Sequence, residues 1–247
     1  MLIYFSVTNY KSFRDKAEFN MIAAPAHDEG YQDHVYRGYT PNLLRLSAIY
    51  GNNGAGKSNL LEALGTLKRI ICGKFYKRVS EEILYYKFDS AAINKPTEFE
   101  AEFISNNQRY VYHLSVVLGK ITEEWLTTVN NDGYQTEVFN RKQKDNKDLI
   151  NMPSFDDNEK EKIRLEIYSE EISKRKFRTF LEYGATHDVA LLQDAYKWFE
   201  RQLEVVKPNA HLADKLSFFS DDNMRSLAID MLHTLDFPAN VNFRITA

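Results

Sequence analysis

The stretch Gly51-Asn52-Asn53-Gly54-Ala55-Gly56-Lys57-Ser58 carries the most specific pattern in this sequence. It matches G-x-x-x-x-G-K-[ST], in which successive backbone N–H groups surround a chain of phosphates. Glycine allows the backbone to approach a ligand closely because it has no Cβ atom. The stretch therefore predicts a phosphate-binding loop, with Lys57 reaching the β- and γ-phosphates of a nucleotide and Ser58 placing its hydroxyl on Mg²⁺.

The residues on both sides of this loop supply the context that it requires. Residues 43–50 are apolar and predict a short buried strand. After the loop, apolar residues recur at helical spacing and Gly73 follows them, so a helix is predicted over 57–72, and its N-terminus adds positive partial charge. The alternative is a glycine turn before an ordinary amphipathic helix. The helical stripe consists of Leu60, Leu64, Leu67 and Ile71.

The remaining chain divides by its periodicity. Residues 2–7 and 13–22 predict two strands around a turn, and alternation predicts a hairpin across Asn106-Asn107 with further strands near 121–129 and 134–140. Residues 160–206 favour helices, with Leu192, Ala195, Phe199 and Leu203 as the clearest stripe. The expected divisions are a β-rich lobe at 1–140, a polar loop at 141–157, a helical subdomain at 158–235 that ends in a short helix near 222–235, and the start of a further strand at 236–247.

Composition excludes several classes of protein. The chain has 247 residues, 43% of them apolar and 27% charged, as is ordinary for a globular protein. Its net charge of −3 gives no overall positive field that would attract nucleic acid, although this does not exclude a local basic patch. Cys72 is the single cysteine, the N-terminus is unlike a signal peptide, and no apolar run approaches a membrane span. We therefore expect a cytoplasmic protein without a membrane partner.

Two motifs together resemble a known family. Residues 53–64, with the sequence NGAGKSNLLEAL, resemble the phosphate loop of ABC-type ATPase heads of the SMC, RecF and OLD kind, and Asn9-Tyr10-Lys11-Ser12-Phe13 resembles the turn that opens those heads. In that family the turn lies beside the nucleotide, which makes Lys11 and Ser12 candidate contacts. A plain β-turn is the alternative for residues 9–13. The candidate loop residues are Gly51, Asn52, Asn53, Gly54, Ala55, Gly56, Lys57, Ser58 and Asn59.

A second resemblance extends over most of the chain. The sequence is similar to bacterial AAA-family ATP-binding proteins of the RloA and abortive-infection type, which are ABC-like ATPases of phage defence. The similar segments begin with YGNNGAGKSNLLEAL, PTEFEAEF and RYVYHLSVVLGKITEEWL, and continue with VFNRK, AYKWFERQLEVVKP and AIDMLHTLDFPANVNFRI.

The resemblance implies a fold and a function. The implied fold is an α/β P-loop NTPase, the N-terminal lobe of an ABC-ATPase head with a mixed or antiparallel sheet and a helical elaboration. ATP and Mg²⁺ would be its cofactors, and heads would form a homodimer or higher oligomer around ATP and work with a nuclease-type effector. Two other functions stay open: a nucleotide-switched scaffold that does not hydrolyse ATP, and a DNA-repair head like RecF or SMC.

Hydrolysis requires groups that the sequence search did not find. A Walker B strand ends in an Asp that supports Mg²⁺ and a Glu that positions water, but the segment LAID at 227–230 is followed by Met231. We therefore assign no catalytic residue, interpret the chain as the N-terminal portion of a longer ATPase, and expect weak or no hydrolysis from it alone. A degenerate nucleotide binder or a split protein are the alternatives. The family's Q-loop should lie near residues 179–188, where Thr186 or His187 replaces the expected glutamine.

Charged clusters elsewhere have simpler interpretations. Glu98, Glu100 and Glu102, with Glu123-Glu124 further on, are expected on the solvent side of a half-buried hairpin. The histidine spacing does not match a metal site. The basic run at 174–178 could contact phosphate backbones, but pairing with preceding glutamates on an exposed helix accounts for it. A second basic zone at 68–78 suits a helix C-terminus.

Overall fold

The structure is a computed structural model that describes residues 1–24, 32–39, 41–73, 85–145, 147–175 and 177–206. Residues 1–205 form one compact unit, and residues 206–247 form a second. The helix expected near 222–235 and the strand expected at 236–247 lie outside the described residues.

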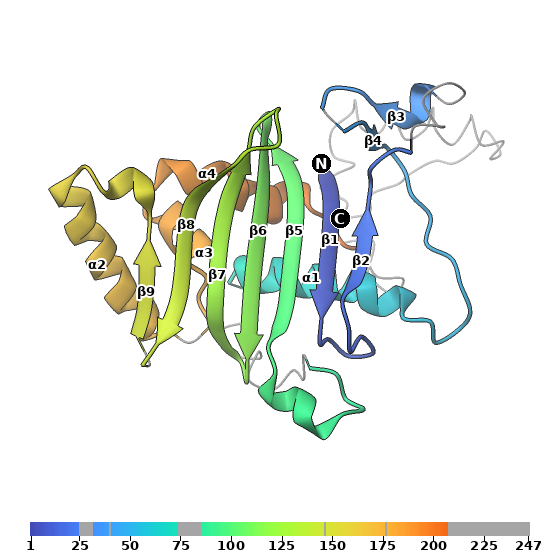
Figure 1. Cartoon of the computed structure of the whole chain (residues 1–247), viewed down its shortest axis with the longest axis horizontal. Coiled ribbons are helices and arrows are strands. Elements are labelled where there is room, and N and C mark those ends of the chain that lie inside the picture. The colour runs from blue at the N-terminus through green and yellow to red at the C-terminus, as the bar shows by residue number, and fades with distance from the viewer. Residues whose placement is uncertain (25–31, 40, 74–84, 146, 176, 207–247) are drawn as a thin grey trace, which may run out of the picture. The chain divides into compact units, whose positions relative to one another are not determined.

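Seven antiparallel strands form the main sheet, in the order β2-β1-β5-β6-β7-β8-β9 (Figure 1). From β5 to β9 each strand pairs with the next one along the chain, so the predicted hairpin and the two further strands are confirmed. The strands are β1 (Leu2–Thr8), β2 (Ala17–Asn20), β5 (Thr97–Ser105), β6 (Gln108–Val117), β7 (Lys120–Val129), β8 (Gln135–Lys144) and β9 (Lys147–Asn151).

Two of the hairpins use two-residue turns with left-handed backbone. Asn106 and Asn107 join β5 to β6 with φ angles of 48° and 61°, and Leu118 and Gly119 join β6 to β7 with φ angles of 47° and 73°. Positive φ at both positions matches the twist of the flanking strands, and Asn and Gly tolerate it best. Local turn chemistry therefore fixes the register of the centre of the sheet.

In the described part of the chain four α-helices accompany the sheet: α1 (Lys57–Ile71), α2 (Glu159–Ser173), α3 (Phe180–Thr186) and α4 (Ala190–Lys197), which continues into a π-helical turn η5 (Trp198–Gln202). Figure 1 shows α1, α3 and α4 behind the sheet, and α2 beside β9. The helix predicted over 57–72 is confirmed, and 159–202 is mainly helical, as expected. The short elements are η2 (Gln32–His34), β3 (Val35–Tyr36), β4 (Leu43–Leu44), η3 (Ser90–Asn94) and η4 (Pro153–Phe155).

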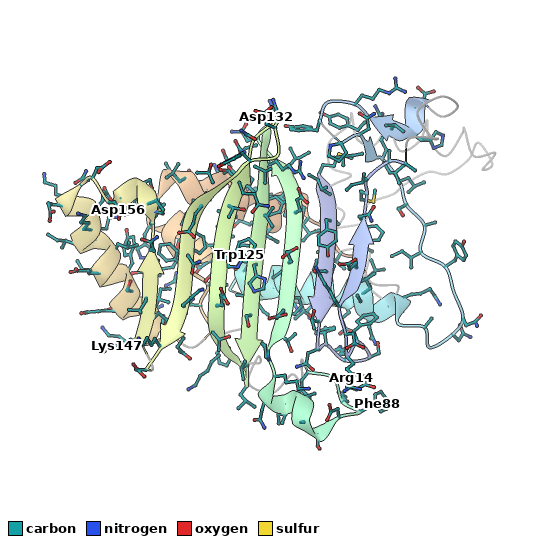
Figure 2. All side chains as sticks on the ribbon, in the orientation of Figure 1. Arg14, Phe88, Trp125, Asp132, Lys147 and Asp156 are labelled. Atoms are coloured by element: carbon teal, nitrogen blue, oxygen red, sulfur yellow. The ribbon has the colours of Figure 1, made fainter. Side chains whose placement is uncertain are left out.

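The core lies between the sheet and the helices α1, α3 and α4. The predicted stripe on α4 and η5 is buried, and the Phe103 ring of β5 stacks on Trp198 with ring centroids 4.2 Å apart. Helix α1 contributes Leu67, Ile70 and Ile71 to the same cluster. On the opposite face, which no helix of the described residues covers, Trp125 stacks on His113 at 5.1 Å (Figure 2). Helix α1 is thus held along the helix-covered face of the sheet, and its first turn follows directly on residues 51–56.

The strand expected at 43–50 is wrong beyond its first two residues. Only Leu43–Leu44 is a strand, paired with β3, and residues 45–50 have no regular structure. Leu46 is 76% exposed and Tyr50 is 93% exposed. An apolar run indicates that a segment can be buried. A strand also needs a neighbouring strand to which its backbone can form hydrogen bonds, and no described strand pairs with 45–50.

Two further expectations need correction. The strand predicted at 13–22 shortens to β2, because the turn at 9–13 closes on itself through the bridge between Tyr10 and Phe13. The polar loop expected at 141–157 contains the end of β8, strand β9 and η4, with Arg141 only 1% exposed. Two of its charged side chains, Arg141 and Asp148, are buried because they form an ion pair with each other at 2.8 Å, whereas most of the others are exposed.

Glu124 does not share the solvent face with Glu123. A register shift in the pairing of β6 with β7 places Ser115 opposite Glu123 and Val116 opposite Ile121. Such a bulge adds one residue to one strand and reverses which side chains face the core beyond it. Glu124 is therefore fully buried on the helix-covered face, whereas Glu98, Glu100 and Glu102 are only partly buried and alternate with buried residues, as expected.

Candidate functional site

Residues 51–58, called the glycine loop below, end at the first turn of α1. Gly54 and Gly56 have φ angles of 85° and 89°, in the left-handed region that favours glycine. A Cβ atom on Gly56 would lie 2.9 Å from the Phe13 ring, whereas one on Gly54 would meet nothing within 4 Å. Gly56 is thus required for packing as well as for backbone conformation, and Gly54 leaves open space above the loop.

The N-terminus of α1 has no negative side chain of its own. Gly56 is the N-cap, no side chain caps the helix, and its first turn contains no acid. The first N–H groups of a helix lack partners within the helix, and together with the helix dipole they favour an anion. Residues 51–55 are exposed, so this end of α1 is accessible to a ligand.

Lys57 is the first residue of α1, and its side chain folds back over the glycine loop. Its Nζ donates hydrogen bonds to the carbonyl oxygens of Gly51, at 2.7 Å, and Asn52, at 2.8 Å. The ammonium group therefore stands over the open loop, and the adjacent Ser58 is exposed. A cation, a hydroxyl and unpaired backbone donors at one place are the groups that a magnesium nucleotide needs, so these residues fit such a ligand.

The turn at residues 9–13 packs lengthwise along α1. The Ser12 hydroxyl accepts a hydrogen bond from the Asn59 side chain at 2.7 Å, and Lys11 forms an ion pair with Glu62 at 2.7 Å. The Tyr10 hydroxyl lies 2.9 Å from that of Thr66. The three α1 positions, 59, 62 and 66, share one face because helix residues three or four apart are neighbours.

The same turn is anchored on its other side by Asn9, which is buried and has a φ of 52°. Its side-chain amide donates to the carbonyl oxygens of Ala92 and Lys95, both at 3.0 Å, and its side-chain oxygen accepts from the N–H of Tyr86 at 2.9 Å. Asparagine is among the residues that tolerate left-handed backbone. Residues 9–13 are therefore a rigid bridge between α1 and the segment that begins at Tyr86.

The structure brings every sequence-predicted site residue to one place, with Ser12 and Lys11 against the first two turns of α1. Contact of these residues with a nucleotide stays a prediction. Sequence reasoning missed Phe13 as the packing partner of Gly56, and Glu62 as the partner of Lys11. The spacing of Glu62 on α1 could have suggested that it lies near the turn, because it follows Asn59 by three residues.

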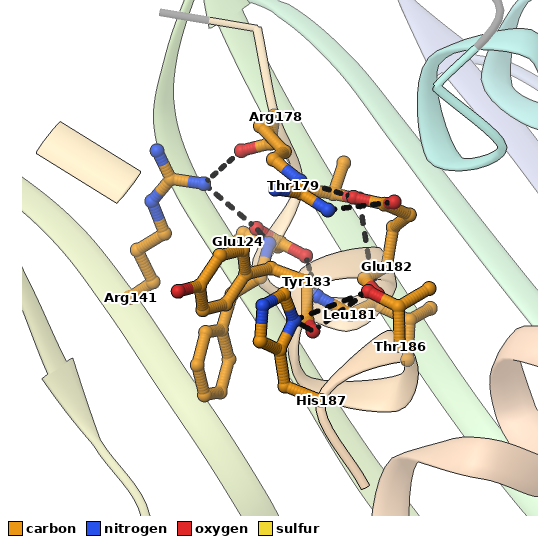
Figure 3. A network of polar contacts seen from close by, with 10 residues as sticks. Glu124, Arg141, Arg178, Thr179, Leu181, Glu182, Tyr183, Thr186 and His187 are labelled. Atoms are coloured by element: carbon orange, nitrogen blue, oxygen red, sulfur yellow. Dashed lines mark hydrogen bonds and ion pairs between the residues drawn. The ribbon is translucent and has the colours of Figure 1, made fainter. Parts of the chain in front are cut away.

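Among the described residues Glu124 is the most deeply buried acid, and it takes part in a polar network (Figure 3). Its carboxylate accepts from the N–H groups of Phe180, at 2.7 Å, and Leu181, at 2.9 Å, and from the Arg141 guanidinium at 3.1 Å. Burial raises the pKa of Glu124, and Arg141 and the backbone N–H groups oppose that rise. The carboxylate serves to hold the start of α3 against β7.

Arg141 extends this network to the edge of the sheet. Its guanidinium donates to Asp148 of β9 at 2.8 Å and to the carbonyl oxygen of Arg178 at 2.7 Å. Arg178 in turn pairs with Glu182. The segment at 179–188, where the Q-loop was expected, is therefore α3 and its C-cap His187, and its start is held by the core face of the sheet.

The basic clusters have partners within the chain. Lys174 pairs with Glu171 at 2.8 Å, and Lys68 contacts Glu204 at 3.4 Å and also donates to the Leu203 carbonyl oxygen. Arg69 lies on α1 and donates to the Thr66 hydroxyl at 2.9 Å, whereas Lys74, Lys77 and Arg78 of the second basic zone, and Lys176 of the first, lie outside the described residues. The ion pair at Lys174 agrees with the expected pairing to a preceding glutamate, but α2 ends at Ser173, so the run itself follows the helix and the expectation of a helix face at 174–178 is wrong.

Two cavities lie away from the glycine loop. One of about 780 Å³ lies between β9 and α2, and another of about 340 Å³ lies beside Asn9 and η3. Neither is lined by residues 51–59. Among the described residues, no three His, Cys, Asp or Glu side chains are grouped so as to hold a metal ion, and no helix is long and apolar enough to cross a membrane.

Comparison with known families places the chain. Residues 46–235, about three quarters of its length, match the family described as "AAA domain, putative AbiEii toxin, Type IV TA system". The chain belongs to this AAA-domain family. The AAA domain implies an ATPase-like protein that binds nucleotide, typically with Mg²⁺, in agreement with the glycine loop and Lys57. A search of curated proteins found no match.

Proposed function

We propose that this AAA domain is the nucleotide-binding head of an ABC-type ATPase and that it binds Mg-ATP at the glycine loop. The observation that carries the proposal is the uncapped N-terminus of α1, which begins with Lys57 at the end of an open, glycine-rich loop. Lys57 would bind the β- and γ-phosphates, and Ser58 would contribute a hydroxyl to Mg²⁺. Asn59, Lys11 and Ser12 would border the same site.

The exposure of the glycine loop supports a role for a second copy. Residues 51–55 are exposed, so phosphates bound there would face water on one side. Electrostatic interactions are far stronger where water is excluded. We infer that ATP brings two heads together and that the opposing surface covers the nucleotide, so that ATP controls dimerisation. Sedimentation of the chain with and without Mg-ATP tests this step, and a monomer at saturating Mg-ATP contradicts it.

The biological setting is proposed from the family. Its description names an abortive-infection toxin and a type IV toxin–antitoxin system. We infer a role in anti-phage defence, in which the ATP-dependent state of the head controls an effector protein. A scaffold that binds but does not hydrolyse ATP is the second candidate, because the segment LAID at 227–230 is followed by Met231 rather than by the Glu that hydrolysis requires. Because weak or no hydrolysis is expected from this chain alone, the decisive outcome is ATP turnover above background, which would exclude the scaffold.

Substitution of Lys57 by alanine tests the site itself. Charge-assisted hydrogen bonds contribute about 1.5–3 kcal/mol each, so loss of two should weaken Mg-ATP binding by at least about a hundredfold. Lys160→Ala removes an exposed lysine from α2 and serves as the matched control. Calorimetric titration measures both variants against the unmodified chain. Unchanged affinity in Lys57→Ala would refute the assignment of the glycine loop.

A further inference from the structure

The segment at residues 86–88 runs directly beside the turn at 9–13. Tyr86 forms a parallel bridge with Lys11, and the N–H of Lys87 donates to the Lys11 carbonyl oxygen at 3.3 Å. The side-chain oxygen of Asn9 accepts from the N–H of Tyr86 at 2.9 Å. The segment is therefore attached to the element that borders the glycine loop, although more than 70 residues separate the two in sequence.

Both ends of this segment are fixed by hydrogen bonds. Beyond Phe88, the side chain of Asp89 caps the turn η3 by accepting from the N–H of Ala91 at 2.9 Å, and Asn9 binds the carbonyl oxygen of Ala92. The backbone that carries Phe88 thus has a defined position. A ligand that stacks on this residue would not have to order the chain first.

Phe88 itself presents its ring to solvent. It is 82% exposed, and its ring centroid lies 5.5 Å from that of Tyr86 at an interplanar angle of 59°. Figure 2 labels Phe88 and Arg14, the residue that follows the turn, at the same end of the sheet. Apart from this contact with Tyr86, most of the Phe88 ring faces solvent, and aromatic rings are the side chains on which bases stack.

We propose that Phe88, supported by Tyr86, is the platform on which the base of the bound nucleotide stacks. This inference rests on the proposed function, because the glycine loop would hold the phosphates. The base is the opposite end of the same ligand, so it must lie beyond the residues that border the phosphates. Ser12 and Lys11 border α1, Tyr86 pairs with Lys11, and the Phe88 ring lies 5.5 Å from that of Tyr86.

The test separates the base from the phosphates by comparing two ligands, ATP and inorganic tripolyphosphate, each with Mg²⁺. Stacking of one base on an aromatic ring corresponds to roughly a tenfold change in affinity on substitution by alanine. Calorimetry should therefore show that Phe88→Ala weakens ATP binding about tenfold and leaves tripolyphosphate binding unchanged. Phe88→Trp should retain ATP binding, because tryptophan supplies a larger face for stacking.

Two matched variants make the result specific. Tyr134→Ala removes another exposed aromatic, at 76% exposure, from the turn that contains Asp132 at the other end of the sheet in Figure 2, and it should change neither affinity. Tyr50→Ala removes the exposed ring next to Gly51. The inference is overturned if Phe88→Ala binds ATP normally, if it loses both ligands equally, or if Tyr50→Ala produces the selective loss instead.

The failure of the proposed function has a different signature. If the unmodified chain binds neither ligand, or if Lys57→Ala binds both as well as the unmodified chain does, the glycine loop is not the phosphate site and the platform falls with it. If Lys57→Ala loses both ligands while Phe88→Ala changes neither, the proposed function stands and the platform alone is wrong. The expected pattern is loss of both ligands in the first variant and of ATP alone in the second.

Discussion

The N-termini of helices α3 and α1 differ in whether side chains of the protein bind their first N–H groups. Helix α3 is capped by the side chain of Thr179, and its first two N–H groups donate to the carboxylate of Glu124. Helix α1 begins at Gly56 without a side-chain cap, without an acid in its first turn, and next to an exposed loop. Both ends carry the same partial positive charge, about half an elementary charge, because it arises from the peptide dipoles.

The difference shows what each helix end is for. In α3 the sheet supplies the anion during folding, so the charge is used to position the helix on β7. In α1 the donors and Lys57 are left without an internal anion, although a side-chain cap would stabilise the helix by about 1 kcal/mol. The N-terminus of α1 is the one whose sequence matches a phosphate-binding pattern. Glu124 is therefore an internal example of the kind of anion that we propose α1 binds from solution.

The largest effect should follow from removing the anion at α3. Glu124→Ala leaves Arg141 buried with one acidic partner fewer and leaves two N–H groups of α3 unpaired. Breaking a buried ion pair costs about 3–5 kcal/mol, so the free energy of unfolding in urea should fall by that amount. The nucleotide affinity of chains that remain folded should be unchanged, because the network lies apart from the glycine loop.

A double substitution distinguishes this network from ordinary packing. Arg141→Met alone should also be strongly destabilising, because it leaves Glu124 and Asp148 without their shared cation. The double variant, Glu124→Ala with Arg141→Met, should lose clearly less stability than the sum of the single losses. Strict additivity of the two free-energy changes would show that the two side chains are not coupled and would remove the basis of the comparison.

The fold could be predicted from the sequence where the signal is local. Helix α1 shows apolar spacing, and the β5–β6 hairpin has alternation and an asparagine turn, so both were confirmed. Pairing decisions are not local. The bulge that turns Glu124 inward depends on the register of β6 against β7, and the fate of 45–50 depends on whether another strand lies beside it. Neither the register of a neighbouring strand nor its presence can be recognised from the residues of the segment itself.

The candidate site divides in the same way. The glycine loop, Lys57 and Ser58 could be predicted because their pattern is contiguous, and Lys11 and Ser12 because a short motif contains both. The segment at 86–88 could not, because it reaches the turn through backbone hydrogen bonds to Asn9 and Lys11. Backbone contacts between distant segments depend on the whole fold, and they impose no residue type that a sequence pattern could reveal.

A smaller effect should follow from giving α1 the charge that α3 has. Asn59 is the third residue of α1, the position that Glu182 occupies in α3. Asn59→Asp should stabilise the chain by about 0.3–1 kcal/mol through the helix dipole and weaken Mg-ATP binding about tenfold by repulsion. Asn59→Ala is the control, since it removes the hydrogen bond to Ser12 without adding charge. If Asn59→Asp binds ATP as tightly as the alanine variant, the end of α1 is not the phosphate site.

The smallest effect concerns the protonation of the anion at α3. Burial raises the pKa of Glu124 above its usual 4.5. Just above pH 4.5 the folded chain therefore retains a proton that the unfolded chain has lost. The resulting contribution to the free energy of unfolding is complete below pH 4.5 and is lost as the pH rises through the folded-state pKa of Glu124. Glu124→Gln cannot titrate, so its stability should lack this decline. Urea unfolding of both chains from pH 4 upward measures the difference between them. If that difference instead grows in favour of the glutamate as the pH rises, Arg141 and the α3 N–H groups outweigh burial, and Glu124 is held as a full carboxylate.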